Sequence, residues 1–473
     1  MLCSGELAGM TVTESAGTSA ETPPQPTQGR ELLRQDVPNA RPVPRRFALL
    51  VLQLVLLLTA VKGLNLTQGA GVALPFALCV YGFAAFVVHY WLPFHLKRVG
   101  FVILSLGAVF AVFGPDDWLA VTSSDYWVQI GQAATFLVAL LAVGLFFYGT
   151  LRLPIPFWFR IAVIVGVGAA FVYGRGDDRW LTDRQWTVLA GIFMFRLILY
   201  AKAVMVAREP EKLGDFMCYF YLLPNLFFPL FPVVDYTKFK RGYYVNNIHA
   251  SAQKGIFWMA RGLTHLCLFR ILYQREIAHR EVQDFFTLVL FLFQFYLQYV
   301  RVSGLFHFVT GMLHLFGWNL PETSRKYLLS SSFTDFWRRA NIYWKDFMVT
   351  IFYFPIYFRL RRLNETVALS VATAVVFVAT TVLHAYQMFW IKREFAIHSQ
   401  DYVFWGTFGA VVIFNVLYDA AFGGVKKERS KPVAFFIRVA RTIGVYIFIS
   451  VIWSVWSMPL QRWWDTVSYV FQN

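Results

Sequence analysis

The chain has little charge and few cysteines for its length. Of its 473 residues, 15% are charged and 4 are cysteine, whereas soluble domains carry about 25% charged residues. The cysteines have no paired spacing, which excludes a disulfide framework and a cysteine-based zinc site. We expect them to be small, mostly buried hydrophobic side chains. They are Cys3, Cys79, Cys218 and Cys267.

Common motifs of cofactor-dependent and hydrolytic enzymes are also missing. The chain has no Walker A loop, no GxGxxG turn, no HExxH helix and no GxSxG elbow. No pair of carboxylates lies inside an apolar run. We therefore expect no bound cofactor and no metal.

Apolar residues dominate what remains. Hydrophobic residues make up 58% of the chain and aromatic residues 19%, and several apolar runs approach the roughly 20 residues that cross a bilayer. Alternating strands of about 10 residues, which a barrel needs, are not seen. The sequence predicts an all-α, polytopic integral membrane protein. We expect roughly ten to twelve transmembrane helices, with re-entrant and interfacial helices around a buried central site.

The net charge of +16 favours lipid contact over nucleic-acid binding. Basic residues lie at the ends of apolar runs, where they hold segments on the cytoplasmic side and meet anionic lipid heads. Arg45 and Arg46 precede the first run, so we expect a cytoplasmic N-terminus. Lys426, Lys427 and Arg429 are also expected to face the cytoplasm.

The chain divides into four expected regions. Residues 1–44 predict a disordered cytoplasmic tail, 45–214 the N-terminal transmembrane helices, 215–423 a core region, and 424–473 a C-terminal transmembrane helix with an interfacial tail. The expected spans are 47–63, 71–93, 99–114, 127–149, 156–174, 185–206, 283–305, 347–361, 366–390, 401–422 and 434–456.

Two segments depart from simple spans. Residues 220–232 are apolar but contain three prolines, which predicts a broken or re-entrant segment buried in protein, with an interfacial loop as the alternative. Residues 252–274 mix basic and apolar side chains. They predict an amphipathic helix that lies partly at the interface.

Histidines are the remaining candidates for chemistry. His384 lies inside the apolar run 371–390, where a polar group is costly and needs a reason. At that depth we expect a neutral imidazole, which is a general base; a hydrogen bond across helices is the alternative. For the others we expect interfacial packing with one hydrogen bond. These are His89, His95, His249, His265, His279, His307 and His314.

A polar stretch precedes His384. Pro321 and Glu322 are followed by residues 333–342, which read Phe-Thr-Asp-Phe-Trp-Arg-Arg-Ala-Asn-Ile. This stretch resembles the signature of the membrane-bound O-acyltransferase (MBOAT) family. In its bacterial branch, with alginate O-acetyltransferase and the teichoic acid D-alanyl transferase, the signature reads Phe-Trp-Arg-Arg-Trp-His-Ile, and a later apolar run carries the catalytic histidine. Residues 231–239 are similar to the family's Gly-Pro-Ile-x-x-Tyr-x-x-Phe region.

The resemblance covers roughly residues 215–420 and has two departures. Asn341 stands where the bacterial branch has histidine, although eukaryotic members often have asparagine or aspartate there. Leu383-His384-Ala385 replaces the common Trp-His-Gly, which leaves the donor and the acceptor open.

The resemblance implies an acyltransferase that moves an acetyl or other short acyl group. The donor would be a cytoplasmic thioester, either acyl-CoA or an acyl carrier, as co-substrate. The acceptor would be a hydroxyl of an envelope polysaccharide or of a lipid-linked molecule, as in polysaccharide O-acetylation at a bacterial inner membrane, with envelope-biosynthesis proteins as partners. His384 would be the catalytic base, and Asn341 would orient the acyl carbonyl or stabilise the oxyanion.

Arg338, Arg339, Trp337 and Lys345 would bind the donor, because guanidinium and ammonium groups bind phosphate. Anchoring of the two arginines at the cytoplasmic surface is the alternative. The site needs the 347–361 span to fold back beside 366–390.

Two other functions stay open from the sequence. Arg196, Gln294 and Gln298 lie within apolar runs and would line the path of a transporter or channel. A non-catalytic member of an acylation complex is the third possibility.

Overall fold

The computed structural model describes residues 42–64, 76–115, 121–175, 180–207, 211–226, 233–273, 277–422 and 430–472. Most of the expected N-terminal tail and the basic residues Lys426, Lys427 and Arg429 lie outside these ranges. The domain boundaries expected at 214/215 and 423/424 stay predictions.

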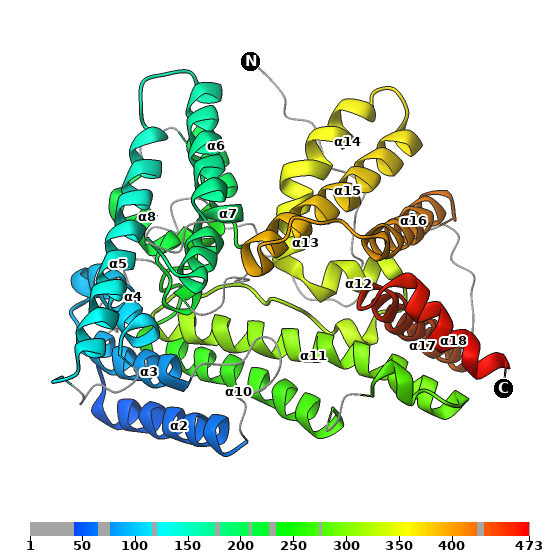
Figure 1. Cartoon of the computed structure of the whole chain (residues 1–473), viewed down its shortest axis with the longest axis horizontal. Helices are drawn as coiled ribbons and strands as arrows, with labels where there is room; N and C mark the ends of the chain where they lie inside the picture. Colours follow the sequence, from blue (N-terminus) through cyan, green and yellow to red (C-terminus); the bar gives the residue numbers. More distant parts are fainter. Residues whose placement is uncertain are drawn as a thin grey trace, which may run out of the picture. The chain divides into compact units, whose positions relative to one another are not determined.

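Helices make up almost all of the ordered backbone in the described ranges, where Tyr243 and Trp318 form an isolated β-bridge. Nine of the described helices are long and apolar enough to cross a membrane, so the protein is an all-α, multi-pass membrane protein, as expected. The helices (Figure 1) are α2 (Pro44–Gly63), α3 (Phe76–Trp91), α4 (Lys97–Phe113), α5 (Ser124–Thr150), α6 (Phe157–Gly174), α7 (Asp183–Val206), α8 (Leu213–Phe220), α9 (Tyr236–Arg241), α10 (Ile248–Leu272), α11 (Phe285–Leu315), α12 (Phe333–Ala340), α13 (Ile342–Met348), α14 (Phe354–Leu360), α15 (Glu365–Lys392), α16 (Ser399–Phe422), α17 (Lys431–Trp456) and α18 (Leu460–Gln472).

Most expected spans match these helices within a few residues, but two do not. The span expected to end at 305 continues as α11 to Leu315. The span expected at 347–361 is built from α13, a π-helix at Val349–Tyr353 and α14, and it is not one of the nine long apolar helices among the described residues. The number of crossings, ten to twelve, stays a prediction.

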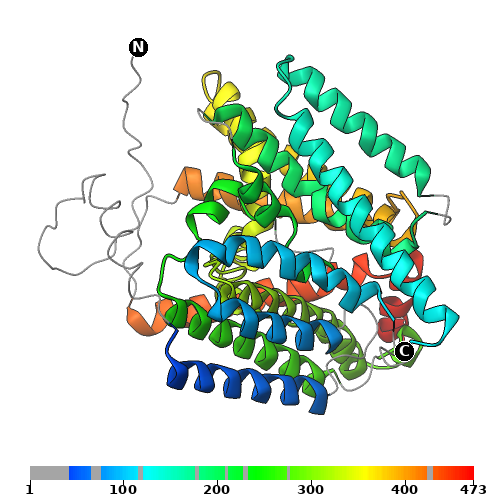
Figure 2. The same ribbon diagram turned by 90° about the vertical axis from the view of Figure 1, so that its left-hand side faces the viewer.

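Helices α10 and α11 pack with their backbones in contact. A Cβ atom on Gly262 would lie 2.5 Å from the carbonyl oxygen of Gly304, and one on Gly255 would lie 2.6 Å from that of Gly311. On both helices the two glycines are seven residues apart, which places them on one face. Small residues at such a crossing let helices approach closely. Figures 1 and 2 show α2, α10 and α11 side by side.

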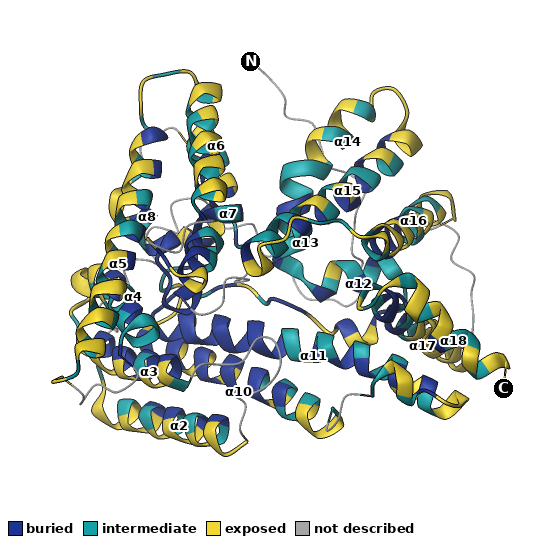
Figure 3. Cartoon of the chain, in the orientation of Figure 1, coloured by how far each residue is buried: buried dark blue, intermediate teal, exposed yellow. Residues whose placement is uncertain are grey.

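This crossing explains why α11 is longer than expected. All residues from Ser303 to Leu315 are buried, and Figure 3 shows this part of α11 in the buried colour. Residues 252–274 lie mostly in a helix, α10, as expected, but the sequence interpretation missed its glycine face. Phe257 and Ile271 on α10 are exposed, so the interfacial placement of α10 stays a prediction.

The proline-rich segment is broken, as expected, over the part that is described. α8 ends at Phe220, and a short 3-10 helix follows at Leu223–Leu226, whose residues are all buried. Residues 227–232 lie outside the described ranges. The buried Arg196 of α7 donates through Nη1 to the carbonyl of Tyr219 (2.8 Å) and through Nη2 to that of Phe220 (3.2 Å). Arg196 therefore satisfies the carbonyl end of α8.

The required fold-back of the chain is present. α14 and α15 pack as a hairpin (Figure 1). Asn364 lies between them and caps α15, since its side chain accepts a hydrogen bond from the backbone N–H of Val367 at 3.0 Å. Asparagine at this position is a strong helix start signal.

The glycine crossing generates the first prediction. Gly262→Ala should lower the free energy of unfolding by about 1–3 kcal/mol, the usual effect of overpacking, because its Cβ would meet backbone atoms of Gly304 and Phe308. The same change at Gly166, where a Cβ meets no described atom within 4 Å, is the control and should leave stability unchanged or higher. Thermal denaturation in detergent measures both. Equal melting temperatures for the two variants would contradict the close crossing.

Candidate functional site

His384 lies half-buried in α15 with one side of its ring fixed. Nδ1 lies 3.0 Å from the carbonyl oxygen of Thr380, one turn earlier. A carbonyl only accepts, so Nδ1 donates, and the neutral ring then carries its lone pair on Nε2. The hydrogen bond therefore selects the tautomer in which Nε2 is the base.

Three tryptophans surround this imidazole, and we call them the tryptophan cluster. The ring centroids of Trp344, Trp405 and Trp456 lie 5.2, 4.8 and 6.3 Å from that of His384. They come from α13, α16 and α17, so three helices besides α15 shape the surroundings of His384. Trp456 is itself held by Asp401, which accepts from its indole N–H at 2.6 Å.

Sequence reasoning missed Trp405, Trp456 and Asp401. Asp401 lies in the first turn of α16. No acidic residue lies within four positions of His384 in the sequence, so no local pattern indicated an acid near this histidine. Only the packing of α16 and α17 against α15 brings these side chains to the histidine.

Asn341 lies at the junction of α12 and α13. Its Oδ1 accepts a hydrogen bond from the backbone N–H of Trp344 at 3.2 Å, which makes Asn341 the N-cap of α13. The indole of Trp344 is the same ring that packs against His384. The two candidate catalytic residues are therefore linked through one tryptophan, which one of them positions and the other contacts.

The four candidate donor-binding residues lie in different settings. Arg338 is exposed, whereas Arg339 forms an ion pair with Asp335 at 2.6 Å. Trp337 packs against Phe377, with ring centroids 5.0 Å apart, so its ring belongs to the core between α12 and α15. The assignment of these residues to the donor stays a prediction.

Lys345 belongs to a cluster that links α13 to α9. Its ammonium contacts Oδ1 of Asp346, and Lys238 of α9 contacts Oδ2 of the same carboxylate at 2.8 Å. Burial acts to raise the pKa of Asp346, but the hydrogen bonds and charges of the two lysines outweigh it and leave the pKa below its usual value. Asp346 is therefore ionised at neutral pH. Lys238 is the residue that sequence reasoning missed here.

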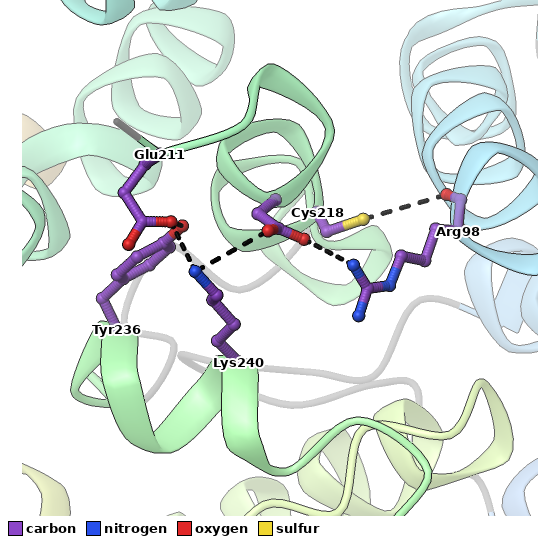
Figure 4. Close-up of polar contacts among 6 residues, drawn as sticks. Arg98, Glu211, Cys218, Tyr236 and Lys240 are labelled. Carbon is purple, nitrogen blue, oxygen red and sulfur yellow. Dashed lines mark hydrogen bonds and ion pairs between the residues drawn. The ribbon is translucent and has the colours of Figure 1, made fainter. Parts of the chain in front are cut away.

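A second ionic cluster lies on the other side of α9 (Figure 4). Lys240 contacts Glu211 at 2.6 Å and Asp215 at 3.8 Å, and Arg98 contacts Asp215 at 2.7 Å. The hydroxyl of Tyr236 donates to Glu211 at 2.8 Å. The cluster joins the start of α4 to α8 and α9, close to where the proline-rich segment begins.

The histidines expected at the interface need a correction. His89, His307 and His314 are fully buried. The two on α11 are buried because this helix continues past its expected end and packs against α10. His89 and His314 bond backbone carbonyls, those of Lys97 and Leu320, each at 3.0 Å. These three histidines are core residues and not interfacial ones.

Gln294, a candidate for lining a path, has a backbone partner as well. Its side chain accepts from the N–H of Ile277 and donates to the carbonyl of Ile277, both at 2.9 Å. This paired bond ties the connection before α11 to the helix. As with Arg196, the contacts favour a structural role.

The three cysteines among the described residues are free thiols. Cys79 and Cys218 are buried, and Cys267 is partly exposed. Burial raises the pKa of the Cys218 thiol to about 12, so it is inert. Within the described ranges, no three His, Cys, Asp or Glu side chains gather as a metal site would require.

No protein-family model matches the chain, and no curated protein matches it. The MBOAT resemblance therefore depends on the residues quoted above and stays a prediction.

Asn341→Ala should lower the free energy of unfolding by about 1 kcal/mol, because the N–H of Trp344 loses its cap. Asn341→Ser keeps a capping oxygen and should retain most of the stability. Thermal denaturation distinguishes the two variants. A serine variant as unstable as the alanine variant would show that the cap does not hold α13 in place.

The Asp346 cluster predicts a pH dependence. Since the pKa of Asp346 is lowered by folding, its stabilising effect is complete above the ordinary value near 4 and is lost as pH falls through the lowered value. The difference in melting temperature between the wild type and Asp346→Asn should therefore be constant from pH 7 to 5 and shrink below pH 4. A difference that stays constant down to pH 3 would contradict the ion pairs.

Proposed function

We propose that the protein is a membrane-bound O-acyltransferase. The observation that supports it best is the arrangement of His384. Its Nδ1 is held by the Thr380 carbonyl, its Nε2 is the basic nitrogen, and Trp344, which Asn341 caps, lies against its ring. A single base in an aromatic surrounding suits the removal of a proton from a hydroxyl.

The proposed reaction uses His384 as its base. His384 Nε2 takes the proton of the acceptor hydroxyl as its oxygen attacks the carbonyl carbon of the thioester. The carbon–sulfur bond then breaks, and the imidazolium returns the proton to the leaving thiolate. The products are an ester and a free thiol. General base catalysis of this kind contributes about 10²–10⁴ in rate.

Asn341 would stabilise the oxyanion of the tetrahedral intermediate. Its Oδ1 is engaged by the N–H of Trp344, so its Nδ2 hydrogens are the groups left to donate to the developing charge. The tryptophan cluster would exclude water from the thioester and thereby limit hydrolysis.

The substrates follow from the sequence resemblance. We propose a cytoplasmic acyl-CoA or acyl-carrier thioester as donor and a hydroxyl of an envelope polysaccharide or lipid-linked molecule as acceptor, with an acetyl or other short acyl group transferred. The protein would lie in a bacterial inner membrane, with its N-terminus in the cytoplasm, in contact with lipids and envelope-biosynthesis proteins.

The contacts of Arg196 and Gln294 argue against the transporter hypothesis. Arg196 and Gln294, two of the three side chains that suggested a path, are bonded to backbone groups of neighbouring segments. A non-catalytic role in an acylation complex remains the alternative. Turnover of labelled acyl-CoA by the purified protein, measured with and without partner proteins, distinguishes the acyltransferase from a non-catalytic member of such a complex.

His384→Ala should lower acyl transfer by about 10²–10⁴ without loss of folding. His398→Ala is the matched control, since His398 is an exposed histidine close to Glu394, and it should keep full activity. Labelled acyl-CoA turnover measures the rates, and size-exclusion chromatography checks folding. A folded His384→Ala protein with full acyl transfer would refute the proposed function.

A further inference from the structure

Helix α9 carries two lysines that differ in how their charge is compensated. Lys240 and Lys238 are two residues apart, and each takes part in a different ionic cluster. The two clusters differ in net charge and therefore in how strongly they attract an anion.

The Lys240 cluster is electrically balanced. Its two cations, Lys240 and Arg98, meet two carboxylates, Glu211 and Asp215, and Figure 4 shows Lys240 pointing toward Glu211, with Arg98 on the opposite side. Each cation has an acidic partner within 3 Å. An incoming anion would gain little there, since it would compete with carboxylates already in place.

The Lys238 cluster carries an excess positive charge. Lys238 and Lys345 share the single carboxylate of Asp346, one lysine on each oxygen. Counted over these three side chains, the charge is +1; a further carboxylate, that of Asp235, accepts from the backbone N–H of Lys238 at 3.0 Å and caps α9. The side chains of Lys238, Lys345 and Asp346 are 57%, 25% and 31% exposed, so a ligand can reach the ammonium groups.

This cluster lies partly on α13, the helix that also carries Trp344 of the candidate site. Lys345 and Asp346 directly follow Trp344, whose indole contacts His384. About one turn further along the chain, the ammonium of Lys202 donates to the carbonyl of Thr350 in the π-helix at 3.0 Å. An anion bound here would lie on α13, the helix whose Trp344 contacts His384.

We propose that Lys238 and Lys345, held together by Asp346, form the receptor for a phosphate group of the acyl donor. This inference rests on the proposed acyltransferase function and names the part of the donor that is recognised. Each ammonium has three N–H donors, of which Asp346 engages one, so both lysines keep donors for phosphate oxygens. Asp346 offsets the repulsion between the two lysines while no donor is bound.

A phosphate can also come from an anionic lipid headgroup, and the experiment separates the two sources. Binding of coenzyme A is measured by calorimetry on the full chain in nanodiscs of phosphatidylcholine. The double variant Lys238→Gln, Lys345→Gln should bind coenzyme A about tenfold more weakly or worse, since two charge-assisted contacts are lost. Lys240→Gln, on the same helix in the balanced cluster, should bind it as the wild type does.

Two further arms make the result specific. The double variant Lys238→Arg, Lys345→Arg keeps both charges and should bind coenzyme A nearly as the wild type does. It is the control for the general effect of substituting these two positions. Pantetheine, which lacks phosphate, should bind the wild type and the glutamine variant equally. Equal coenzyme A affinity in the wild type and a folded glutamine variant would overturn the receptor. So would a defect confined to phosphatidylglycerol nanodiscs, which would assign the lysines to lipid.

The same proteins separate failure of this inference from failure of the proposed function. His384→Ala should keep the coenzyme A affinity of the wild type while losing turnover. With the glutamine variant, KM for acyl-CoA should rise, and turnover of a phosphate-free N-acetylcysteamine thioester should be unchanged. Coenzyme A binding by a wild type without any acyl transfer would refute the acyltransferase and leave the receptor standing. Normal KM in the glutamine variant would refute the receptor alone.

Discussion

The structure depends on one constraint. Inside a membrane protein, a backbone N–H or C=O group without a hydrogen bond in its own helix needs a hydrogen-bond partner from the protein itself. Three irregular places meet it with long or polar side chains. Arg196 satisfies the carbonyls at the end of α8, Lys202 satisfies Thr350 in the π-helix, and Asn341 caps α13. Pro355, which has no N–H to donate, lies just after the π-helix and accounts for the break in regular bonding there. The first role of these three polar side chains is thus to form hydrogen bonds with backbone groups that lack a partner within a helix.

The candidate site depends on one of these hydrogen bonds, the cap of α13. Because Asn341 caps the N–H of Trp344, the start of α13 is fixed, and the indole is held against His384. α16 and α17 close the other sides with Trp405 and Trp456. The histidine is therefore oriented from its own helix by Thr380 and enclosed by three others. Such an arrangement limits motion of the imidazole without consuming the nitrogen that would act as base.

Charge is distributed around α9 in a way that separates structure from recognition. The cluster of Lys240 with Glu211 and Asp215 joins helices and is balanced, whereas the cluster of Lys238 with Asp346 keeps a positive excess at an accessible place. The positive total charge of the chain, interpreted from the sequence as a matter of lipids and topology, thus has a local component on α9 and α13.

The sequence by itself determined the fold class and most helix limits, because the length of an apolar run decides whether a helix can cross a bilayer. It also identified His384 as a polar group inside an apolar run and the return of the chain before the 366–390 span. It did not determine the glycine face of α10 or the partner of Asp346, which is Lys238, 108 residues earlier in the chain. These depend on which helices meet and at what distance, and local patterns carry no information on that. Tertiary packing alone decided that a histidine predicted as an isolated base is enclosed by tryptophans.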